Sequence, residues 1–181
     1  MLGTNKSERA VRDGLPVCFP RLWRFCASLT GRKDHADDLA QKTCLRAIEK
    51  AALFEPGTHL DRWLFTMARR IWINDMRQAA IRQTASFTDE GQPDVDDKKP
   101  DVETNILARE VFTRMNALPE AQRAAALLVF VEGYKYSETA EILDIPIGTV
   151  MSRVSAARKT LTHQVYPATN RSVAGATDRR K

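Results

Sequence analysis

The stretch of sequence that decides the fold is YSETAEILDIPIGTVMSRVSAARK, residues 136–159. Its second half, extended by two residues, carries an apolar stripe at the i, i+4, i+7 and i+11 spacing of one buried helix face: Val150, Val154, Ala157 and Leu161. The first half places Ala140 and Leu143 on an inner face of its own. Between the halves, Asp144 tolerates the left-handed backbone of a tight turn, and Pro146 suits the start of a new helix, where no amide is needed.

Two short helices joined by such a turn form the helix-turn-helix pattern, in which the second helix lies in the major groove of DNA. A helical hairpin with a polar outer face and no DNA partner would show a similar pattern. The stretch therefore favours DNA binding and leaves the second interpretation open.

The length of 181 residues is enough for one domain or for two small ones. No segment is apolar and long enough to cross a membrane, and the first residues lack the uninterrupted apolar run of a signal peptide. We therefore expect a cytoplasmic protein with no membrane partner.

Cysteine and histidine are too scattered for a metal site. The cysteines at positions 18, 26 and 44 include no CxxC pair, and the three histidines are far apart in sequence. No acidic metal cluster and no nucleophile beside a base is recognisable. We expect no metal, no cofactor and no enzymatic activity, with Cys26 and Cys44 as reduced, half-buried thiols.

Charge is distributed unevenly along the chain, whose formal net charge is +5. Residues 1–84 hold 15 basic and 9 acidic side chains, residues 85–105 hold 2 and 7, and residues 106–181 hold 11 and 7. Two basic blocks thus flank an acidic strip. Basic blocks favour a polyanionic partner, although charge alone does not choose between DNA, RNA and anionic lipid.

The acidic strip, residues 85–105, has two prolines, one glycine and almost no large apolar side chain, so it cannot fold alone. We interpret it as an extended linker between a lobe at residues 12–84 and another at residues 106–166. Residues 1–11 are expected to form a flexible arm and residues 167–181 a flexible tail. No strand alternation occurs, so the predicted fold class is all-α, with two small helical domains.

The first lobe contains three predicted helices. The first has an apolar stripe that stops at Gly31, a left-handed C-cap: Phe19, Leu22, Phe25, Cys26 and Leu29. Asp34 can cap the second, whose expected core stripe is Leu39, Leu45, Ile48 and Ala52. The third is longer, covers residues 60–83, and has its core stripe at Leu60, Leu64, Met67 and Ile71.

The third predicted helix also carries a separate face, within about 60 degrees on the helix, made by Trp63, Arg70, Asn74 and Arg77. A ring, an amide and two guanidiniums on one strip would suit stacking on unpaired bases and contact with phosphates. A solvated basic face, with the tryptophan tucked against the core, explains the pattern equally well. Phe65, Trp72 and Met76 lie opposite the core stripe, either as a partner surface or as a contact between the lobes.

Five segments together resemble a bacterial sigma factor of the extracytoplasmic-function (ECF) group, within the sigma-70 family. They are residues 15–31, 37–47 (DDLAQKTCLRA), 62–70 (RWLFTMARR), 117–120 (ALPE) and 145–153 (IPIGTVMSR). Each motif alone is weak, but five in the family's order, over residues 12–163, are specific. Nothing resembles sigma region 1.1 or region 3, which places the resemblance in the ECF group.

The resemblance implies a transcription initiation factor that binds core RNA polymerase, directs it to particular promoters and helps to melt them, under an anti-sigma factor. The first lobe would be region 2, whose implied contacts with the clamp helices of the polymerase largest subunit are Asp38, Leu39, Gln41, Lys42, Thr43 and Arg46. Its third helix and the loop before it would hold the melted minus-ten element through His59, Trp63, Arg70, Asn74 and Arg77. The second lobe would be region 4, which reads the minus-thirty-five element as duplex and contacts the polymerase flap.

In the second lobe, the residues implied to lie against DNA are Thr149, Met151, Ser152, Arg153, Ser155, Ala156, Arg158 and Lys159. Met151 stands where the family commonly has Lys or Arg, and the set is poor in bidentate arginine contacts to guanine. We therefore expect Arg153 and Arg158 to contact phosphates, and the element to be recognised through methyl groups, hydroxyls and DNA shape. Lys135 replaces the usual capping serine, so we expect the preceding helix to start nearer Ser137.

Some alternatives stay open. The acidic linker is either a plain tether or an RNA mimic in the basic channels of the polymerase. Arg70 and Asn74 stand where the family usually has Asn and often has Asp, which leaves the captured base undetermined. A stand-alone helix-turn-helix regulator would need no polymerase, but the chain offers no sensor domain or obvious dimer helix. A sigma mimic that sequesters an anti-sigma protein would carry a receiver domain, for which 181 residues leave no room.

Overall fold

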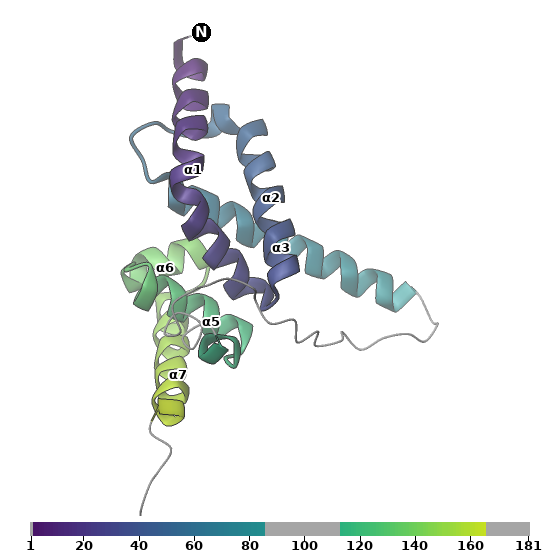
Figure 1. Cartoon of the computed structure of the whole chain (residues 1–181), viewed down its shortest axis with the longest axis vertical. Coiled ribbons are helices and arrows are strands. Elements are labelled where there is room, and N and C mark those ends of the chain that lie inside the picture. The colour runs from purple at the N-terminus through teal and green to yellow at the C-terminus, as the bar shows by residue number, and fades with distance from the viewer. Residues whose placement is uncertain (1, 86–112, 166–181) are drawn as a thin grey trace, which may run out of the picture.

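The computed structural model describes residues 2–85 and 113–165, and within these ranges every regular element is helical, which confirms the all-α prediction. The N-terminal lobe consists of α1 (Leu2–Thr30), α2 (Lys33–Glu49), the short 3-10 helix η1 (Ala51–Leu53) and α3 (Leu60–Ala85) (Figure 1). The C-terminal lobe consists of α5 (Glu120–Ala126), the π-helical segment η2 (Leu127–Val131), α6 (Tyr136–Leu143) and α7 (Ile147–Val165). The linker expected over residues 85–105 lies, except for Ala85, outside the described residues, as does the tail expected over residues 167–181.

Helix α1 begins almost at the start of the chain, so the flexible arm expected over residues 1–11 is wrong from Leu2 onward. Val11 is buried, and Gly14 packs so tightly on Leu60 of α3 that a Cβ would lie 2.4 Å from its side chain. Pro16 and Pro20 both lie inside this helix. Because an interior proline removes a helix hydrogen bond, a single helix running through both prolines was not expected from the sequence.

The junction between α1 and α2 is partly as predicted. Gly31 has a φ of 71°, and its amide donates to the carbonyl of Ala27 at 2.9 Å, so the left-handed C-cap is confirmed. The predicted cap at Asp34 is wrong, because α2 begins at Lys33 with Arg32 before it. Asp34 lies in the first turn instead, where the hydrogen bond from Arg32 lowers its pKa to about 2 and its charge suits the helix dipole.

Helix α2 buries small side chains rather than the large apolar stripe that was expected. Its buried residues recur at helical spacing and are Ala36, Leu39, Ala40, Thr43 and Ala47. Small residues on this face allow α2 to pack closely on α1. Leu45 and Ile48, predicted for the core, are instead 61% and 60% exposed on the outer face, which corrects that prediction.

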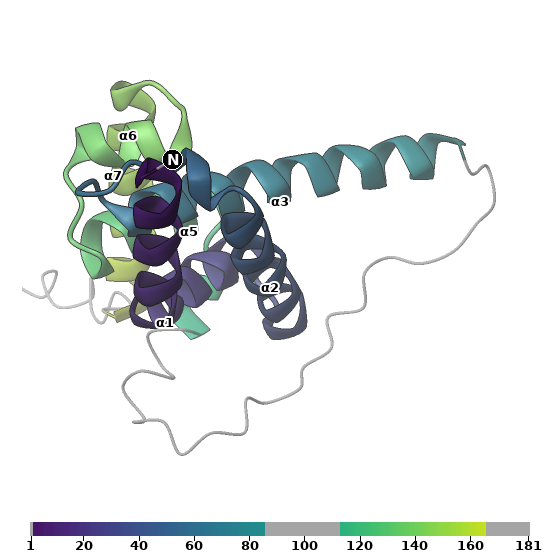
Figure 2. The same cartoon turned by 90° about the horizontal axis from the view of Figure 1, so that it is seen from above.

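The two lobes share one apolar core. Phe65 of α3 is fully buried between Phe25 of α1 and Tyr134 of the C-terminal lobe, with ring centroids 4.8 and 6.0 Å away. Trp72 of α3 donates from Nε1 to the carboxylate of Glu120 at 2.9 Å. For Phe65 and Trp72, contact between the lobes is therefore the interpretation that the structure confirms. Figures 1 and 2 both show α6 beside α3, and α5 contacts α1.

A buried arginine of α5 joins the C-terminal lobe to the end of α1. Arg123, only 8% exposed, donates from Nε to the carbonyl of Ser28 at 2.5 Å and from Nη2 to that of Leu29 at 3.5 Å. Its Nη1 reaches the carbonyls of Asn116 and Leu118 in its own lobe, both at 3.3 Å. The last carbonyls of a helix have no partner within it, and a cation is favourable there, so the guanidinium satisfies both needs of α1.

A cluster of ion pairs closes the same junction. The buried carboxylate of Glu132, in the C-terminal lobe, accepts from Nε of Arg21 at 2.6 Å and lies 2.8 Å from Nη2 of Arg24, both on α1. Arg62 of α3 pairs with Glu138 of α6. One lobe thus supplies the guanidiniums and the other the carboxylates.

Replacing Gly31 by alanine tests the strained end of α1. Alanine adopts this left-handed backbone at a cost of roughly 1–2 kcal/mol, and its Cβ would lie 2.9 Å from Nη2 of Arg123. We expect the free energy of unfolding, measured by urea denaturation, to fall by about 1–3 kcal/mol.

The matched control is Gly148→Ala. Gly148 lies in α7 with open space around the position of a Cβ, so alanine should leave the free energy of unfolding unchanged or raise it by up to about 1 kcal/mol. Equal losses in the two variants would contradict the account of Gly31.

Candidate nucleic-acid and partner-binding surfaces

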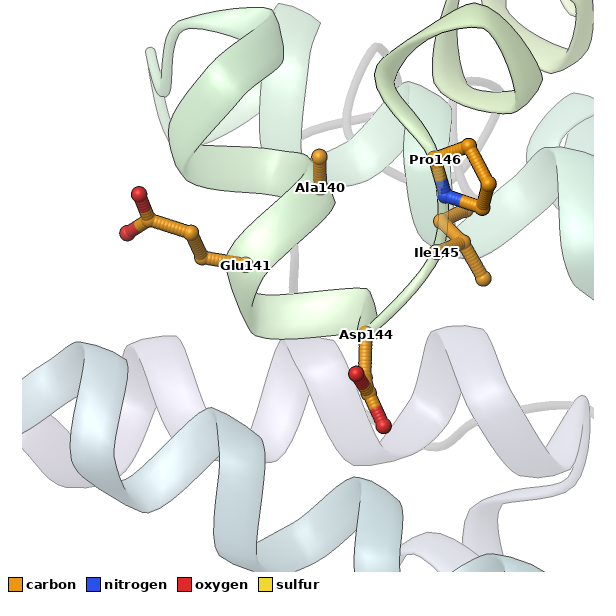
Figure 3. A pocket seen from close by; sticks show the side chains of 5 residues that line it. All are labelled: Ala140, Glu141, Asp144, Ile145 and Pro146. Atoms are coloured by element: carbon orange, nitrogen blue, oxygen red, sulfur yellow. The ribbon is translucent and has the colours of Figure 1, made fainter.

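The turn between α6 and α7 sets the direction of the second helix. Asp144 adopts the predicted left-handed conformation, with a φ of 46°. A shallow hollow of about 360 Å³ opens at this turn, lined by Ala140, Glu141, Asp144, Ile145 and Pro146 (Figure 3). The side chains of Glu141 and Asp144 point in different directions from the turn, and the charge of Asp144 acts on Arg69 of α3. The turn therefore lies close to the N-terminal lobe.

Helix α6 begins at Tyr136, so the expected shift of its start toward Ser137 is wrong. The carboxylate of Glu138 accepts a hydrogen bond from the backbone amide of Lys135 at 2.8 Å. This bond lowers the pKa of Glu138, and the charge of Arg62 lowers it further. Glu138 thereby supplies the reciprocal half of a capping box, and the helix needs no serine before it.

Helix α7 presents one face to the core and the other to solvent, as the sequence predicted. Val150, Val154 and Ala157 are buried. Of the residues predicted to lie against DNA, five are exposed, namely Met151, Ser152, Ser155, Arg158 and Lys159, and three are partly buried, namely Thr149, Arg153 and Ala156. The prediction missed Ile147, which is 50% exposed one turn before Met151. The helical spacing of these two residues is the signal that could have found it.

Two contacts orient polar side chains of α7. The hydroxyl of Ser152 donates to the carbonyl of Thr149 at 3.0 Å. The guanidinium of Arg158 lies 5.4 Å from the ring centroid of Phe130, a cation–π contact that holds it at the far end of the exposed face. Cationic side chains on this face thus lie toward its C-terminal end.

The separate face predicted on α3 is present and largely exposed. Arg70, Asn74 and Arg77 are exposed, as is His59 just before the helix. Figure 2 shows the C-terminal half of α3 projecting away from the rest of the molecule. Met76, on another side of this half, is 44% exposed and takes no part in the apolar contact between the lobes described above.

Trp63 differs from its neighbours on that face because it is partly buried. Its ring packs against Phe54 with centroids 5.4 Å apart, and Phe54 is itself part of the core. The loop before α3 is therefore anchored at its first residue, and Trp63 forms a wall of the face rather than a free platform. The structure brings Trp63 and the exposed residues onto one side of α3, and both earlier interpretations fit this arrangement.

On α2, four of the six residues implied to dock on polymerase are exposed: Asp38, Gln41, Lys42 and Arg46. Leu39 and Thr43 are buried, and the Thr43 hydroxyl donates to the carbonyl of Leu39 at 2.7 Å. These two side chains hold α2 in the core and offer no surface to a partner. The outward-facing Leu45 and Ile48 were missed as surface residues, although their spacing from the exposed Gln41 marks the same face.

The charged residues of α2 that are implied to dock on polymerase are already paired. Lys42 lies 2.8 Å from Asp38 and 3.2 Å from Asp75 of α3, and these hydrogen bonds raise the pKa of Lys42. Arg46 lies 3.2 Å from Glu49. Exposed pairs of this kind contribute little to stability, so a partner can exchange them at small cost.

Electrostatics at the junction of the lobes centre on Asp61, the second residue of α3. Burial alone would raise its pKa, but hydrogen bonds from Tyr134 and the amide of Arg62, with the charge of Arg21, outweigh burial, and the pKa is lowered. For Tyr134, burial and then the bond to Asp61 raise the pKa. Near neutral pH, Asp61 therefore stays ionised and Tyr134 stays neutral.

Within residues 2–85 and 113–165, no group of three or more histidine, cysteine or acidic side chains could hold a metal ion. No described helix is long and apolar enough to span a bilayer. Cys26 is buried and Cys44 partly buried, and burial raises the pKa of both thiols.

Comparison with known families agrees with this division into lobes. The family described as sigma-70 region 2 matches residues 18–81, and the family described as sigma-70, region 4 matches residues 108–161. The chain is 34% identical over 157 residues to the ECF RNA polymerase sigma factor EcfG of Rhodopseudomonas palustris (strain TIE-1), covering 87% of this chain and 86% of that protein. It is 33% identical over 161 residues to the ECF RNA polymerase sigma factor SigC of Mycobacterium tuberculosis (strain CDC 1551 / Oshkosh), covering 88% and 85%.

Two solved structures share the fold. The sigma factor RpoE in complex with the anti-sigma factor NepR from Bartonella quintana matches with a TM-score of 0.68 and 30% identity, covering 85% of this chain and 95% of that one. CnrH in complex with the cytosolic domain of CnrY matches with a TM-score of 0.59 at 18% identity, covering 93% and 97%, which indicates a common fold. The resemblance inferred from five sequence motifs is thereby confirmed.

Proposed function

The chain belongs to the ECF group of the sigma-70 family, and from this membership we propose how it directs RNA polymerase to promoters: one surface binds polymerase and two bind DNA. The observation that carries the proposal is that α2, α3 and α7 each present an exposed face of different chemistry. The face of α2 is apolar with charged edges, that of α3 combines cations with an amide, and that of α7 is the open side of a helix-turn-helix. A stand-alone regulator would need only the last of these.

The polymerase-binding surface is the outer face of α2. Leu45 and Ile48 form its apolar centre, and Asp38, Gln41, Lys42 and Arg46 surround it. Apolar side chains inside a polar rim are typical of protein interfaces. The small residues on the opposite face of α2 support this role. They allow α2 to pack closely on α1, and the large apolar side chains Leu45 and Ile48 then face outward.

The strip on α3 binds the single-stranded minus-ten element. Arg70 and Arg77 contact the backbone phosphates, while Asn74 offers an amide to a base edge and His59 lies at the entrance. Trp63, fixed against Phe54, lines one side of the path. Opening each base step costs a few kcal/mol, which stacking and hydrogen bonds to the extruded bases offset.

Helix α7 reads the minus-thirty-five element as duplex, with Met151, Ser152 and Ser155 toward the bases and Arg158 and Lys159 toward the phosphates. The protein acts in the cytoplasm and by binding alone, without covalent chemistry. An anti-sigma factor controls it, which the solved complex of a relative with its anti-sigma factor supports.

The decisive test mixes the purified protein with core RNA polymerase and sequences the transcripts that start in vitro on genomic DNA. We expect a small set of start sites that share two upstream elements, and tight binding of protein to core polymerase. The proposal would be overturned if the purified protein did not bind core polymerase but bound an operator of its own tightly.

In the same assay, Leu45→Ser combined with Ile48→Ser should weaken binding to core polymerase by about tenfold or more, because two half-exposed apolar anchors are lost. The matched control is Val17→Ser, which removes an exposed apolar side chain from α1 and should leave binding unchanged. Urea denaturation should find all of these variants as stable as the parent protein.

Asn74→Ala should impair promoter opening more than duplex binding, because its amide meets a base only after strand separation. Permanganate footprinting measures opening, and a filter or fluorescence assay with holoenzyme measures binding. We expect opening to fall about tenfold, as for loss of one or two hydrogen bonds, with little change in binding. Met76→Ala, on another side of α3, is the control. Equal loss of opening and of binding would count against this role.

A further inference from the structure

The first two turns of the recognition helix α7 are apolar where they face solvent. Ile147 and Met151 are 50% and 53% exposed, one helical turn apart, on a strip that continues through Ser155 to Lys159. Val150, next to Met151, is fully buried, so the core of the lobe is already complete without these two side chains. Two adjacent apolar side chains on a face that meets DNA require an apolar counterpart there.

Polar groups near this apolar pair are engaged elsewhere. The hydroxyl proton of Ser152 goes to the carbonyl of Thr149 at 3.0 Å. Arg153, the first cation of α7, is partly buried and lies toward the N-terminal lobe. Burial of Arg69 in α3 lowers the pKa of that residue, and the nearby positive charge of Arg153 lowers it further. The first two turns therefore offer the base edges mainly a thioether and a branched aliphatic chain, with the Ser152 hydroxyl left only as an acceptor.

Residues at the start of a recognition helix contact base edges, and the apolar group that the major groove displays is the C5-methyl of thymine. We propose that Ile147 and Met151 read thymine methyl groups in the minus-thirty-five element. Side chains one helical turn apart are about 5–6 Å apart, which fits thymines one or two steps apart on one strand. Arg158 and Lys159, at the other end of the strip, hold the phosphates. This inference rests on the proposed function and adds what the site reads.

The test uses holoenzyme and a promoter mapped by the transcript sequencing described above. Each thymine of the upstream element is replaced in turn by uracil, which removes only the C5-methyl. We expect about fourfold weaker binding at one or two positions, the effect of one buried methyl group. Ile147→Ala or Met151→Ala should abolish that penalty, whereas Val131→Ala, an exposed apolar residue outside α7, should leave it intact.

Uracil tolerated at every position would overturn the inference, as would an equal penalty in the parent and in both alanine variants. If the alanine variants lose affinity for polymerase instead, the apolar pair docks on protein and the inference is likewise wrong. Failure of the proposed function would look different, because no holoenzyme would form and no transcript would start.

Discussion

The arrangement of the whole molecule depends on the placement of one guanidinium, that of Arg123, at the carbonyl end of α1. A helix end and a buried cation are each unfavourable alone, since the first leaves carbonyls without donors and the second loses its hydration. Together they satisfy each other, because the cation meets the negative end of the helix dipole and donates to the carbonyls of Ser28 and Leu29. Gly31 makes room for this contact, which fixes where the C-terminal lobe lies on the N-terminal lobe.

Local chemistry made part of this structure predictable. The left-handed turn at Asp144, the C-cap at Gly31 and the buried stripe of α7 depend on neighbours within a few residues, and all three were predicted correctly. Family resemblance then added an expectation of which faces meet DNA and polymerase. The start of α6 was mispredicted because the rule for capping was applied to Lys135 alone, whereas the carboxylate that caps the helix comes from Glu138 three residues later.

The errors share a physical cause, which is contact between distant parts of the chain. Leu45 and Ile48 have the size and spacing of core residues, and only the close approach of α2 to α1 through small side chains turns them outward. The N-terminal half of α1 is helical through Pro16 because Val11 and Gly14 pack within the lobe. Likewise, the sequence allows Phe65 to face either an external partner or the other lobe. Tertiary packing against Tyr134 selects the contact between the lobes. Hydrophobic periodicity predicts that a helix has an apolar face, but not which element or partner packs against that face.

The same contacts set two requirements in opposition. Burying Phe65 and Arg123 between the lobes stabilises the free chain, while promoter recognition, as proposed, needs the lobes tens of ångströms apart. Since the predicted DNA-facing residues Arg70, Asn74 and Met151 are exposed even with the lobes packed together, this packing does not hide them and limits only their separation. Under the proposed function, the free energy of separating the lobes is offset by binding of polymerase to α2, where Leu45 and Ile48 are exposed. The exposed apolar surface of α2 and the interlobe ion pairs of the N-terminal lobe are therefore energetically coupled under the proposed function. The free energy gained by binding polymerase offsets the free energy lost when the lobes separate.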